Sequence, residues 1–315
     1  MSKSDFSPTV YLSGGLGNQL FQIAGGLQFK PKKIVINTSQ VNGRFDLTEF
    51  LRFVARNHGL QVIEDSTSPS AFFVKAHNLS LRSTRWVGKS AIQNFMVRVL
   101  VRAVHFFCTL SPKDVFTMQI DFDKFVSKNS DFSVIGYFQL EQVAKVIKKD
   151  LSEYLDFYLE SHSDPLAKNV DCDLMLHVRR GDYISENQIG MLSLDYFDSA
   201  LNAILKNESI SKINYFSNEE INPTFFSSTA RIQEISLPVT QSAIELLAKM
   251  RSGRLFLISN STLSWWAAYL STNPKKQVVA PIPWFRTLSE PVNLIPKGWI
   301  RFPAIWSQGN ESENG

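Results

Sequence analysis

Two consecutive arginines are the residues of this sequence best suited to binding a negatively charged group. They stand in the segment His177-Val178-Arg179-Arg180-Gly181-Asp182-Tyr183. A guanidinium keeps its charge and holds phosphate oxygens through a fork of N–H donors, so an adjacent pair suits a diphosphate. The arginines end a strand-like run, Leu174–Arg179, and ligands of parallel α/β sheets bind where strands end. We expect at least one of Arg179 and Arg180 to face a diphosphate.

Structural interpretations compete for the neighbours of these arginines. Asp182 can pair with Arg180 as a salt bridge, and we take such a pairing as the default for one arginine. His177, at the centre of the strand, can be a buried core histidine rather than a group that supports the nucleotide. Strand alternation places His177, Arg179 and Gly181 on one face.

Hydroxyl and amide side chains gather in a second segment, Ile258–Ala268, with the sequence ISNSTLSWWAA. It is a strand end, a polar turn and a helix start, and Ser, Thr and Asn are preferred helix caps. Four hydroxyls, an amide and two tryptophans exceed what a cap requires. A phosphate at the helix start would collect backbone N–H and hydroxyl donors together. The candidate contacts are Asn260, Ser261, Thr262 and Ser264.

Glycines dominate a third segment, Gly14–Gln19, between a predicted strand (Thr9–Ser13) and a predicted helix (Gln19–Phe29). Glycine allows a tight turn and a close approach of the backbone to a ligand, and a helix start offers N–H groups to an anion. A plain turn is the alternative. A dinucleotide-binding turn would need glycine at Leu20 and an acidic residue near Asn37, so NAD and FAD are disfavoured. The candidate contacts are Gly15, Gly17, Asn18 and Gln19.

Weaker patterns concern a base and a metal. The predicted strand Ile213–Ser217 ends in Ser217-Asn218-Glu219, polar groups that suit nucleotide edges or a catalytic base. Asp-x-Asp pairs occur at 121/123 and 171/173, as in metal-dependent sugar transferases. The first pair can cap a helix, and the second precedes its strand, the wrong end for a ligand. No two of the five histidines have metal-pair spacing, so we predict no metal and no other cofactor.

Length and composition bound the elements that position these residues. The chain has 315 residues, which suggests two domains, and 44% hydrophobic residues, which excludes a disordered chain. Two cysteines cannot form a disulfide framework, as in a reducing compartment. No run reaches the roughly 18 apolar residues of a membrane span, and no signal-peptide core is present. We expect a cytoplasmic globular protein.

Strands alternate with helices along most of the chain, which predicts α/β domains with parallel sheets. The polar segment Glu160–Asn169 is the expected boundary between a domain at 1–165 and a domain at 166–306, and the tail 307–315 is expected to be disordered. The other predicted elements are the helices Leu194–Leu205, Ser242–Met250 and Leu263–Leu270 and the strands Ile34–Asn37, Leu255–Ser259 and Gln277–Ala280.

The two halves differ in charge. Residues 1–150 hold 19 Lys and Arg against 11 Asp and Glu, a net of +8, whereas residues 151–315 have a net of −4. Between Ser66 and Lys113 there are seven basic residues and no acidic one. Within this stretch, Ala91–Cys108 has helical spacing of apolar residues. It is either a core helix with a solvated basic face or a surface for anionic lipid or an anionic acceptor.

Together, the strings GGLGNQLFQ, HVRRGDY, YFSN and SNSTLSWWAAYL resemble glycosyltransferase family 11, the α-1,2-fucosyltransferases, and its bacterial members in particular. The match in order and spacing runs from Gly14 to about Trp299. The resemblance implies a glycosyltransferase-B fold: two Rossmann-like domains with the active site in the cleft between them. The N-terminal domain would face the acceptor, and the C-terminal domain would hold GDP-fucose.

The resemblance also implies the reaction: inverting, metal-independent transfer of fucose from GDP-β-L-fucose to the 2-hydroxyl of a terminal galactose. Arg179 would neutralise the β-phosphate of the leaving GDP, with His177 and Asp182 supporting the nucleotide or orienting the arginines. Asn18 would approach the fucose and phosphate. Ser261 and Ser264 would contact the diphosphate.

The catalytic base is left open between Asp182 and Glu219. Many members of the family carry Ser-Asp-Asp where this sequence has Ser217-Asn218-Glu219, which weakens the assignment of Glu219. Phe is also common in the family where Leu263 stands, a conservative difference.

Three alternatives remain at this level. One is another sugar-nucleotide transferase that uses a metal through Asp121 and Asp123; another is a non-catalytic protein of the same fold that binds glycan or nucleotide. An NAD-dependent oxidoreductase is the least favoured. The acceptor is not readable beyond a terminal galactoside, although the basic stretch suits a lipid-linked acceptor and peripheral contact with the inner face of the membrane. We expect no nucleic-acid partner, and the oligomeric state is open.

Overall fold

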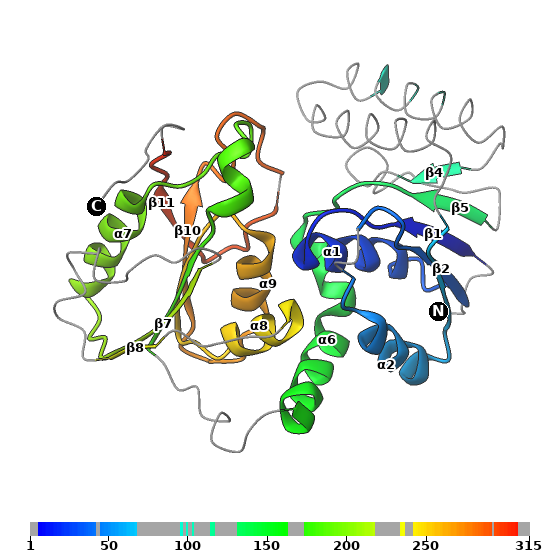
Figure 1. Ribbon diagram of the computed structural model, residues 1–315, viewed down its shortest axis with the longest axis horizontal. Coiled ribbons are helices and arrows are strands. Elements are labelled where there is room, and N and C mark those ends of the chain that lie inside the picture. Colours follow the sequence, from blue (N-terminus) through cyan, green and yellow to red (C-terminus); the bar gives the residue numbers. More distant parts are fainter. Residues whose placement is uncertain are drawn as a thin grey trace. The chain divides into compact units, whose positions relative to one another are not determined.

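Short apolar strands build two separate parallel sheets in this chain (Figure 1). The computed structural model describes residues 6–41, 45–67, 95–96, 99, 103, 114–116, 131–162, 173–217, 234–236, 242–291 and 293–307. The chain divides into two compact units, Met1–Tyr154 with Pro291–Leu294 and Leu155–Glu290 with Ile295–Gly315. The predicted fold class, α/β with parallel sheets in two units, is confirmed.

The sheet of the first unit has the strand order β3-β2-β1-β5-β4. Every strand pair in it is parallel. Because β2 and β3 lie on one side of β1 and β5 and β4 on the other, the strand order reverses at β1 and β5. The strands are β1 (Ser7–Tyr11), β2 (Lys33–Asn37), β3 (Gln61–Asp65), β4 (Asp114–Phe116) and β5 (Asp131–Val134).

Helix α1 (Leu16–Leu27) packs on this sheet at unusually close range because of one glycine. A Cβ atom at Gly26 would lie 2.5 Å from Val10 Cγ2 and 2.9 Å from Ile34 Cδ1, so no larger residue fits without movement. Both Val10 and Ile34 are fully buried. Glycine therefore sets the distance between helix and sheet here.

Two helices were not predicted from the sequence: α2 (Thr48–His58) in the first unit, and α6 (Glu141–His162), which begins in the first unit and ends in the second. The ring of Tyr154 on α6 packs against Phe50 and Phe53 on α2, with centroids 5.5 and 5.8 Å apart. The division between the units falls within α6, before the boundary at 165 that the polar segment suggests.

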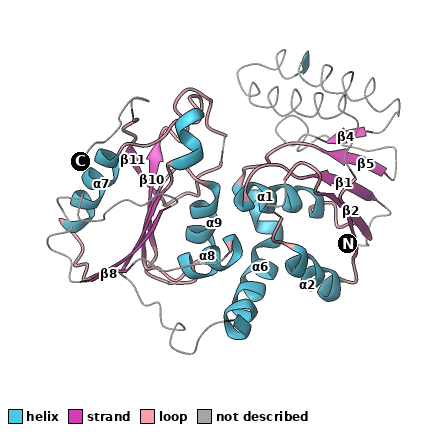
Figure 2. Ribbon diagram, viewed as in Figure 1, coloured by secondary structure: helices cyan, strands magenta, loops and turns pink. Residues whose placement is uncertain are grey.

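The sheet of the second unit has the order β11-β10-β9-β6-β7-β8 and is also parallel. Figure 2 shows α7 on one side of this sheet and α8 and α9 on the other. The strands are β6 (Leu174–Val178), β7 (Lys212–Ser217), β8 (Glu234–Ser236), β9 (Leu255–Ile258), β10 (Gln277–Ile282) and β11 (Ile300–Pro303), and the helices are η2 (Gly181–Ser185), α7 (Leu194–Leu205), α8 (Ala243–Met250) and α9 (Thr262–Leu270).

Strand alternation in β6 sorts its residues as expected. Leu174, Leu176 and Val178 join the hydrophobic core that α7 covers. Met175 and His177, between them in sequence, are buried and do not belong to that core cluster. The strand is thus buried on both faces, as in other parallel sheets.

Most predicted elements agree with the structure to within a few residues. Helix α7 has the predicted bounds, and Ser242 caps α8 by accepting a hydrogen bond from the N–H of Glu245 at 3.2 Å. Strand β1 lies two residues earlier than predicted. Its expected end, Ser13, is outside the strand because its N–H donates to Gln22 Oε1 rather than to a neighbouring strand.

The basic stretch is described at few positions. Phe95, Met96, Val99 and Ala103 are helical, but Phe95, Met96 and Val99 are 63%, 65% and 51% exposed. A core-facing role for these three residues is therefore wrong. Arg98, Arg102 and the tail from residue 308 lie outside the described residues. Among the helices that are described, none combines the length and apolar character needed to cross a bilayer.

The close packing of α1 yields a stability prediction. Gly26→Val should lower the free energy of unfolding by about 1–3 kcal/mol, because the added methyls overpack the interface with Val10 and Ile34. Gly15→Ala is the matched control, since nothing lies within 4 Å of a Cβ there. Urea unfolding of both variants checks this, and equal stabilities would contradict it.

Candidate functional site

Two motifs distant in sequence meet at one edge of the second sheet. Strands β6 and β9 are neighbours, and His177 is paired with Ile258. From them β7 and β8 extend the sheet on one side and β10 and β11 on the other. Such a reversal is where open α/β sheets bind ligands, outside the carboxyl ends of the strands. The arginine segment follows β6 and the hydroxyl-rich turn follows β9.

The buried side chain of His177 connects these two segments through a hydrogen bond. Its Nδ1 lies 3.0 Å from Ser259 Oγ, and both residues are buried. Burial, and then the charge of Arg179, lower the pKa of His177 to about 3. The imidazole is therefore neutral at ordinary pH. This geometry fits a histidine that holds the loops in register, in line with its interpretation as a buried residue.

The arginines directly follow β6. The guanidinium carbon of Arg179 lies 5.8 Å from the ring centroid of Tyr183, and Arg179 is half-buried. Arg180 is only 7% exposed, and its carbonyl accepts the N–H of Tyr183 at 2.7 Å where η2 begins. Two adjacent cationic groups thus stand at a strand end with restricted access to water, where a charge interacts more strongly than at the surface. The side chain of Asp182 lies outside the described residues, so its pairing with Arg180 stays a prediction.

The turn after β9 is fastened to the rest of the unit by Asn260. Its Nδ2 donates to the carbonyls of Gly190 at 2.9 Å and Ile189 at 3.3 Å, and its own carbonyl accepts from Tyr183 Oη at 3.4 Å. Asn260 is 1% exposed. Asn260 therefore connects the turn after β9 with the segment that follows β6. A contact of Asn260 with the donor stays a prediction.

The N-terminus of α9 has several features of an anion site. Its N-cap residue, Ser261, makes no side-chain capping bond, and the first turn has no acidic residue. Thr262 is half-buried. Ser264 is buried, and its Oγ donates to the carbonyl of Ser261 at 3.0 Å, which favours a role within the helix. The phosphate contacts expected of Ser261, Thr262 and Ser264 stay predictions.

The two tryptophans of this segment are core residues. Trp265 and Trp266 are fully buried, and Trp265 stacks on Tyr269 with ring centroids 4.7 Å apart. Their place in the motif is explained by packing of α9 rather than by a ligand. At the neighbouring strand, Ser217 ends β7 and is half-buried, whereas Asn218 and Glu219 lie outside the described residues.

The glycine-rich turn lies at the carboxyl end of β1 in the first unit. Gly14 has a φ of +76° and is exposed with Gly15, whereas Gly17 is buried inside α1. The carbonyl of Gly15 accepts the N–H groups of Asn18 and Gln19 as the helix starts. Gln19 Nε2 returns to the carbonyl of Gly14 at 2.9 Å. Gln19 therefore holds the turn, and the backbone at Gly14 and Gly15 is the part that a ligand can approach.

Sequence reasoning missed the loop that faces this turn, residues 135–140 after β5. Gln139 Nε2 donates to Asn18 Oδ1 at 3.0 Å, and Gln22 Nε2 donates to the carbonyl of Gly136 at 3.1 Å. The available signal was the string Gly136-Tyr137-Phe138-Gln139, a glycine and an amide that directly follow an apolar run.

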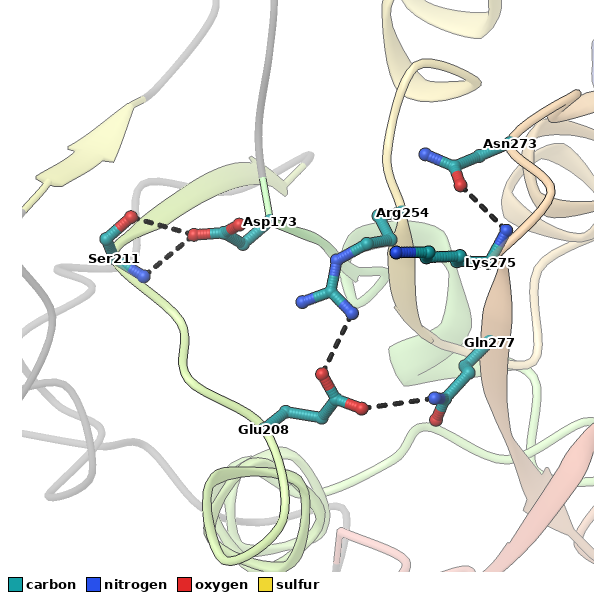
Figure 3. A network of polar contacts seen from close by, with 7 residues as sticks. All are labelled: Asp173, Glu208, Ser211, Arg254, Asn273, Lys275 and Gln277. Atoms are coloured by element: carbon teal, nitrogen blue, oxygen red, sulfur yellow. Dashed lines mark hydrogen bonds and ion pairs between the residues drawn. The ribbon is translucent and has the colours of Figure 1, made fainter.

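The opposite edge of the second sheet holds a polar network of another kind (Figure 3). Asp173 accepts the N–H and Oγ of Ser211, both at 2.8 Å, and Glu208 pairs with Arg254 at 2.8 Å. Burial alone would raise the pKa of Asp173, but the hydrogen bonds from Ser211 and Lys212 lower it overall. Asp173 precedes β6 and ties it to the start of β7. No group of three His, Cys, Asp or Glu in the described part of the chain could hold a metal, while Asp121, Asp123 and Asp171 are outside that part.

The chain thus has two α/β units with parallel sheets, and in the second unit two arginines and a helix start without a side-chain cap follow neighbouring strands at a strand-order reversal. Residues 8–291 match the model of glycosyl transferase family 11, and the chain belongs to this family. It is a glycosyltransferase, and the family predicted from the sequence strings is confirmed.

The chain is also similar to several named proteins. The chain is 25% identical to the O-antigen biosynthesis glycosyltransferase WbnK of Escherichia coli, over 87% of this chain and 93% of that protein. It is 23% identical to an alpha-1,2-colitosyltransferase of Escherichia coli, over 92% and 97%. Among solved structures, NodZ alpha-1,6-fucosyltransferase soaked with GDP-fucose matches with a TM-score of 0.44, 14% identity and coverage of 85% of this chain and 93% of that chain.

The buried His177 yields a prediction about stability against pH. Its folded pKa, about 3, lies below that of an exposed histidine, so the unfolded chain binds the proton first as pH falls. The stability from keeping it neutral is present above about pH 6.5 and is lost below it. Between about pH 7.5 and pH 5.5, the wild type should lose ~1.4 kcal/mol more unfolding free energy than His177→Gln. Urea unfolding at both pH values measures this, and parallel losses would refute it.

Proposed function

We propose that this chain transfers L-fucose from GDP-β-L-fucose to the 2-hydroxyl of a terminal galactose, with inversion and without a metal ion. The observation that supports it most is the placement of Arg179 and Arg180 at the end of β6, next to the strand that leads into the N-terminus of α9. This arrangement offers two guanidinium groups and a helix start to one diphosphate. Membership of family 11 supports the reaction class.

Charge development explains how these groups would act. When the bond between the sugar's C1 and the phosphate oxygen breaks, its electron pair leaves with GDP, while the sugar becomes oxocarbenium-like. Positive groups held at the leaving phosphate stabilise this transition state more than the bound donor. Arg179 is the group we assign to the β-phosphate, and Arg180 and the first turn of α9 add to the same field.

The acceptor hydroxyl attacks from the opposite face. The oxygen of the galactose 2-hydroxyl forms the new bond to C1, which converts the β-linked donor into an α-1,2 product, and its proton passes to a base. We retain Asp182 and Glu219 as the candidates for that base. His177 is not a candidate, because its ring is buried and bonded to Ser259. It acts by holding the β6 and β9 loops together.

A related donor is the second candidate. The alpha-1,2-colitosyltransferase among the relatives carries a different sugar in its name, and colitose is fucose without its 3-hydroxyl. A site that hydrogen-bonds the 3-hydroxyl would reject the deoxy sugar strongly, whereas a site that does not contact it would accept both. Whether the site discriminates between GDP-fucose and GDP-colitose thus depends on whether it hydrogen-bonds the 3-hydroxyl of the sugar.

The acceptor is a galactose-terminated glycan in this proposal. Attachment of that glycan to a lipid, and contact of the basic stretch with an anionic membrane, stay predictions, as does the cytoplasmic location. The exposed Phe95, Met96 and Val99 are compatible with such a surface.

The decisive experiment is incubation of the protein with GDP-fucose or GDP-colitose and a panel of β-galactosides, with the product linkage determined by NMR. We expect an α-1,2-linked fucosyl product and undiminished turnover in excess EDTA. Activity that EDTA abolishes and a divalent metal restores would favour the metal-dependent alternative. Saturable GDP-fucose binding without any product would favour a non-catalytic binding protein. Product formed from GDP-colitose but not from GDP-fucose would replace GDP-fucose by GDP-colitose as the proposed donor.

Substitution of Arg179 tests the assigned role of the guanidinium. Arg179→Ala should lower kcat at least about 100-fold, or ~3 kcal/mol of transition-state stabilisation, with the fold intact by circular dichroism. The kcat of Arg179→Lys should lie between those of the wild type and Arg179→Ala, because lysine keeps the charge but lacks the fork of N–H donors. Arg52→Ala, at an exposed ion pair with Glu49, is the control and should retain full activity. Turnover like the wild type in Arg179→Ala would remove this role.

A further inference from the structure

The first unit has its own strand-order reversal, between β1 and β5. The two strands are parallel neighbours, with Val10 paired to Val134. The glycine-rich turn leaves β1 at this edge, and the loop 135–140 leaves β5 beside it. Because the loops after adjacent parallel strands start at one edge of the sheet, residues about 120 positions apart in sequence lie in contact.

Side-chain amides connect these two loops. Gln22 is fully buried; its Oε1 accepts the N–H of Ser13 at 2.9 Å, and its Nε2 donates to Ser13 Oγ and to the carbonyl of Gly136. Gln139, 9% exposed, donates through Nε2 to Asn18 Oδ1 at 3.0 Å. Gln22 fixes the position of the two loops, and Gln139 bonds to Asn18, the side chain that the family resemblance assigns to the donor.

The loop that carries Gln139 is held rigidly. Phe138 is 1% exposed and has a φ of +51°, a left-handed conformation that is uncommon for a bulky residue. A Cβ at Gly25 of α1 would lie 2.9 Å from Phe138 Cδ2, so the ring packs directly on the helix backbone. This packing holds the strained conformation and sets where Gln139 begins.

The hydrogen bond from Gln139 determines whether the Asn18 amide presents its N–H group or its oxygen to a ligand. An amide has an acceptor side and a donor side, and Gln139 occupies the acceptor side, Oδ1. The donor side, Nδ2, lies against the exposed turn, since a Cβ at Gly14 would be 2.7 Å from it. A ligand that approaches this turn therefore meets an N–H donor, which suits phosphate or sugar oxygens.

We propose that Gln139 is a positioning residue that holds the Asn18 amide with its N–H group toward an oxygen of the bound nucleotide sugar. This inference rests on the proposed function, because the ligand of Asn18 is the donor substrate. Gln139 itself does not need to touch the substrate. Its effect is to prevent the Asn18 amide from turning over and presenting its oxygen to an anionic group.

The test compares two substitutions that a purely structural role would rank in the opposite order. Gln139→Glu keeps the size of the side chain but cannot donate, so the Asn18 amide turns its N–H toward the new carboxylate and its oxygen toward the donor. Gln139→Ala only removes the constraint. We expect kcat to fall about tenfold in Gln139→Ala and further, about 100-fold, in Gln139→Glu. The Kd for GDP, measured by calorimetry, should stay within about twofold, because Arg179, Arg180 and the first turn of α9, which we assign to the diphosphate, are unchanged.

A double-mutant cycle and a control complete the experiment. In an Asn18→Ala background, Gln139→Ala should cause no further loss, because it acts through Asn18. Gln28→Ala removes a bond of similar type, Gln28 Nε2 to the carbonyl of Gly25 at 2.7 Å, and should leave kcat unchanged.

The outcomes separate this inference from the proposed function. Wild-type turnover in both Gln139 variants, a smaller loss in Gln139→Glu than in Gln139→Ala, or additive losses with Asn18→Ala would each overturn the inference alone. Absence of any transfer by the unaltered chain from the sugar nucleotides tested would overturn the proposed function and this inference with it.

Discussion

Parallel pairing of β6 with β9 is the constraint on which the rest of the structure depends. It brings His177 and Ser259, 82 residues apart in sequence, within hydrogen-bonding distance at the carboxyl edge of one sheet. Without this register, the arginines after β6 and the helix start after β9 would not share a location. The hydrogen bond is made by a neutral imidazole, so it persists across the ordinary pH range without adding a buried charge beside Arg179. A neutral side chain is suitable there, since a third cation would add to the repulsion between Arg179 and Arg180.

The two edges of the second sheet perform different work. At the amino ends, Asp173 accepts hydrogen bonds from Ser211 and Lys212, and Glu208 pairs with Arg254, so hydrogen bonds lower the pKa of both carboxyls. At the carboxyl ends, Arg179 and Arg180 stand where β6 finishes, near a helix start whose first turn has no acidic residue. The polar groups at the amino ends thus complete the fold, whereas the carboxyl ends also carry two cationic groups that can meet a ligand. In the first unit, the loops after β1 and β5 are joined by the uncharged amides of Gln22 and Gln139, as the loops of the second unit are joined by the imidazole of His177.

Periodicity and turn chemistry were sufficient for much of the fold. The bounds of α7 followed from its amphipathic spacing, and Ser242 was read correctly as lying at the start of α8. Helix α6 was missed although its sequence carries a local signal, since the buried residues Val143, Ile147, Leu151 and Leu155 recur at four-residue spacing. What the sequence does not encode is the packing of its Tyr154 on α2. The two tryptophans of α9 exceeded what a helix cap requires, and the structure explains them by burial on more than one side of a short helix. For Phe95, Met96 and Val99 the sequence left a core helix and a surface both open, and the structure exposes them, since helical spacing of apolar residues does not reveal what covers them.

The sequence by itself determined the family, the alternation of strands and helices, and which strand ends carry the arginines and the hydroxyl-rich turn, because these depend on residue type and short spacings. Only the tertiary structure decided which side chains meet. The contact of Gln139 with Asn18 and the contact of His177 with Ser259 each join strands that are neighbours in space and distant in the chain. The tertiary structure also showed that the Ser264 hydroxyl is bonded within its own helix. Hydrogen-bond partners and burial depend on strand order and register, and local sequence does not encode either across such separations.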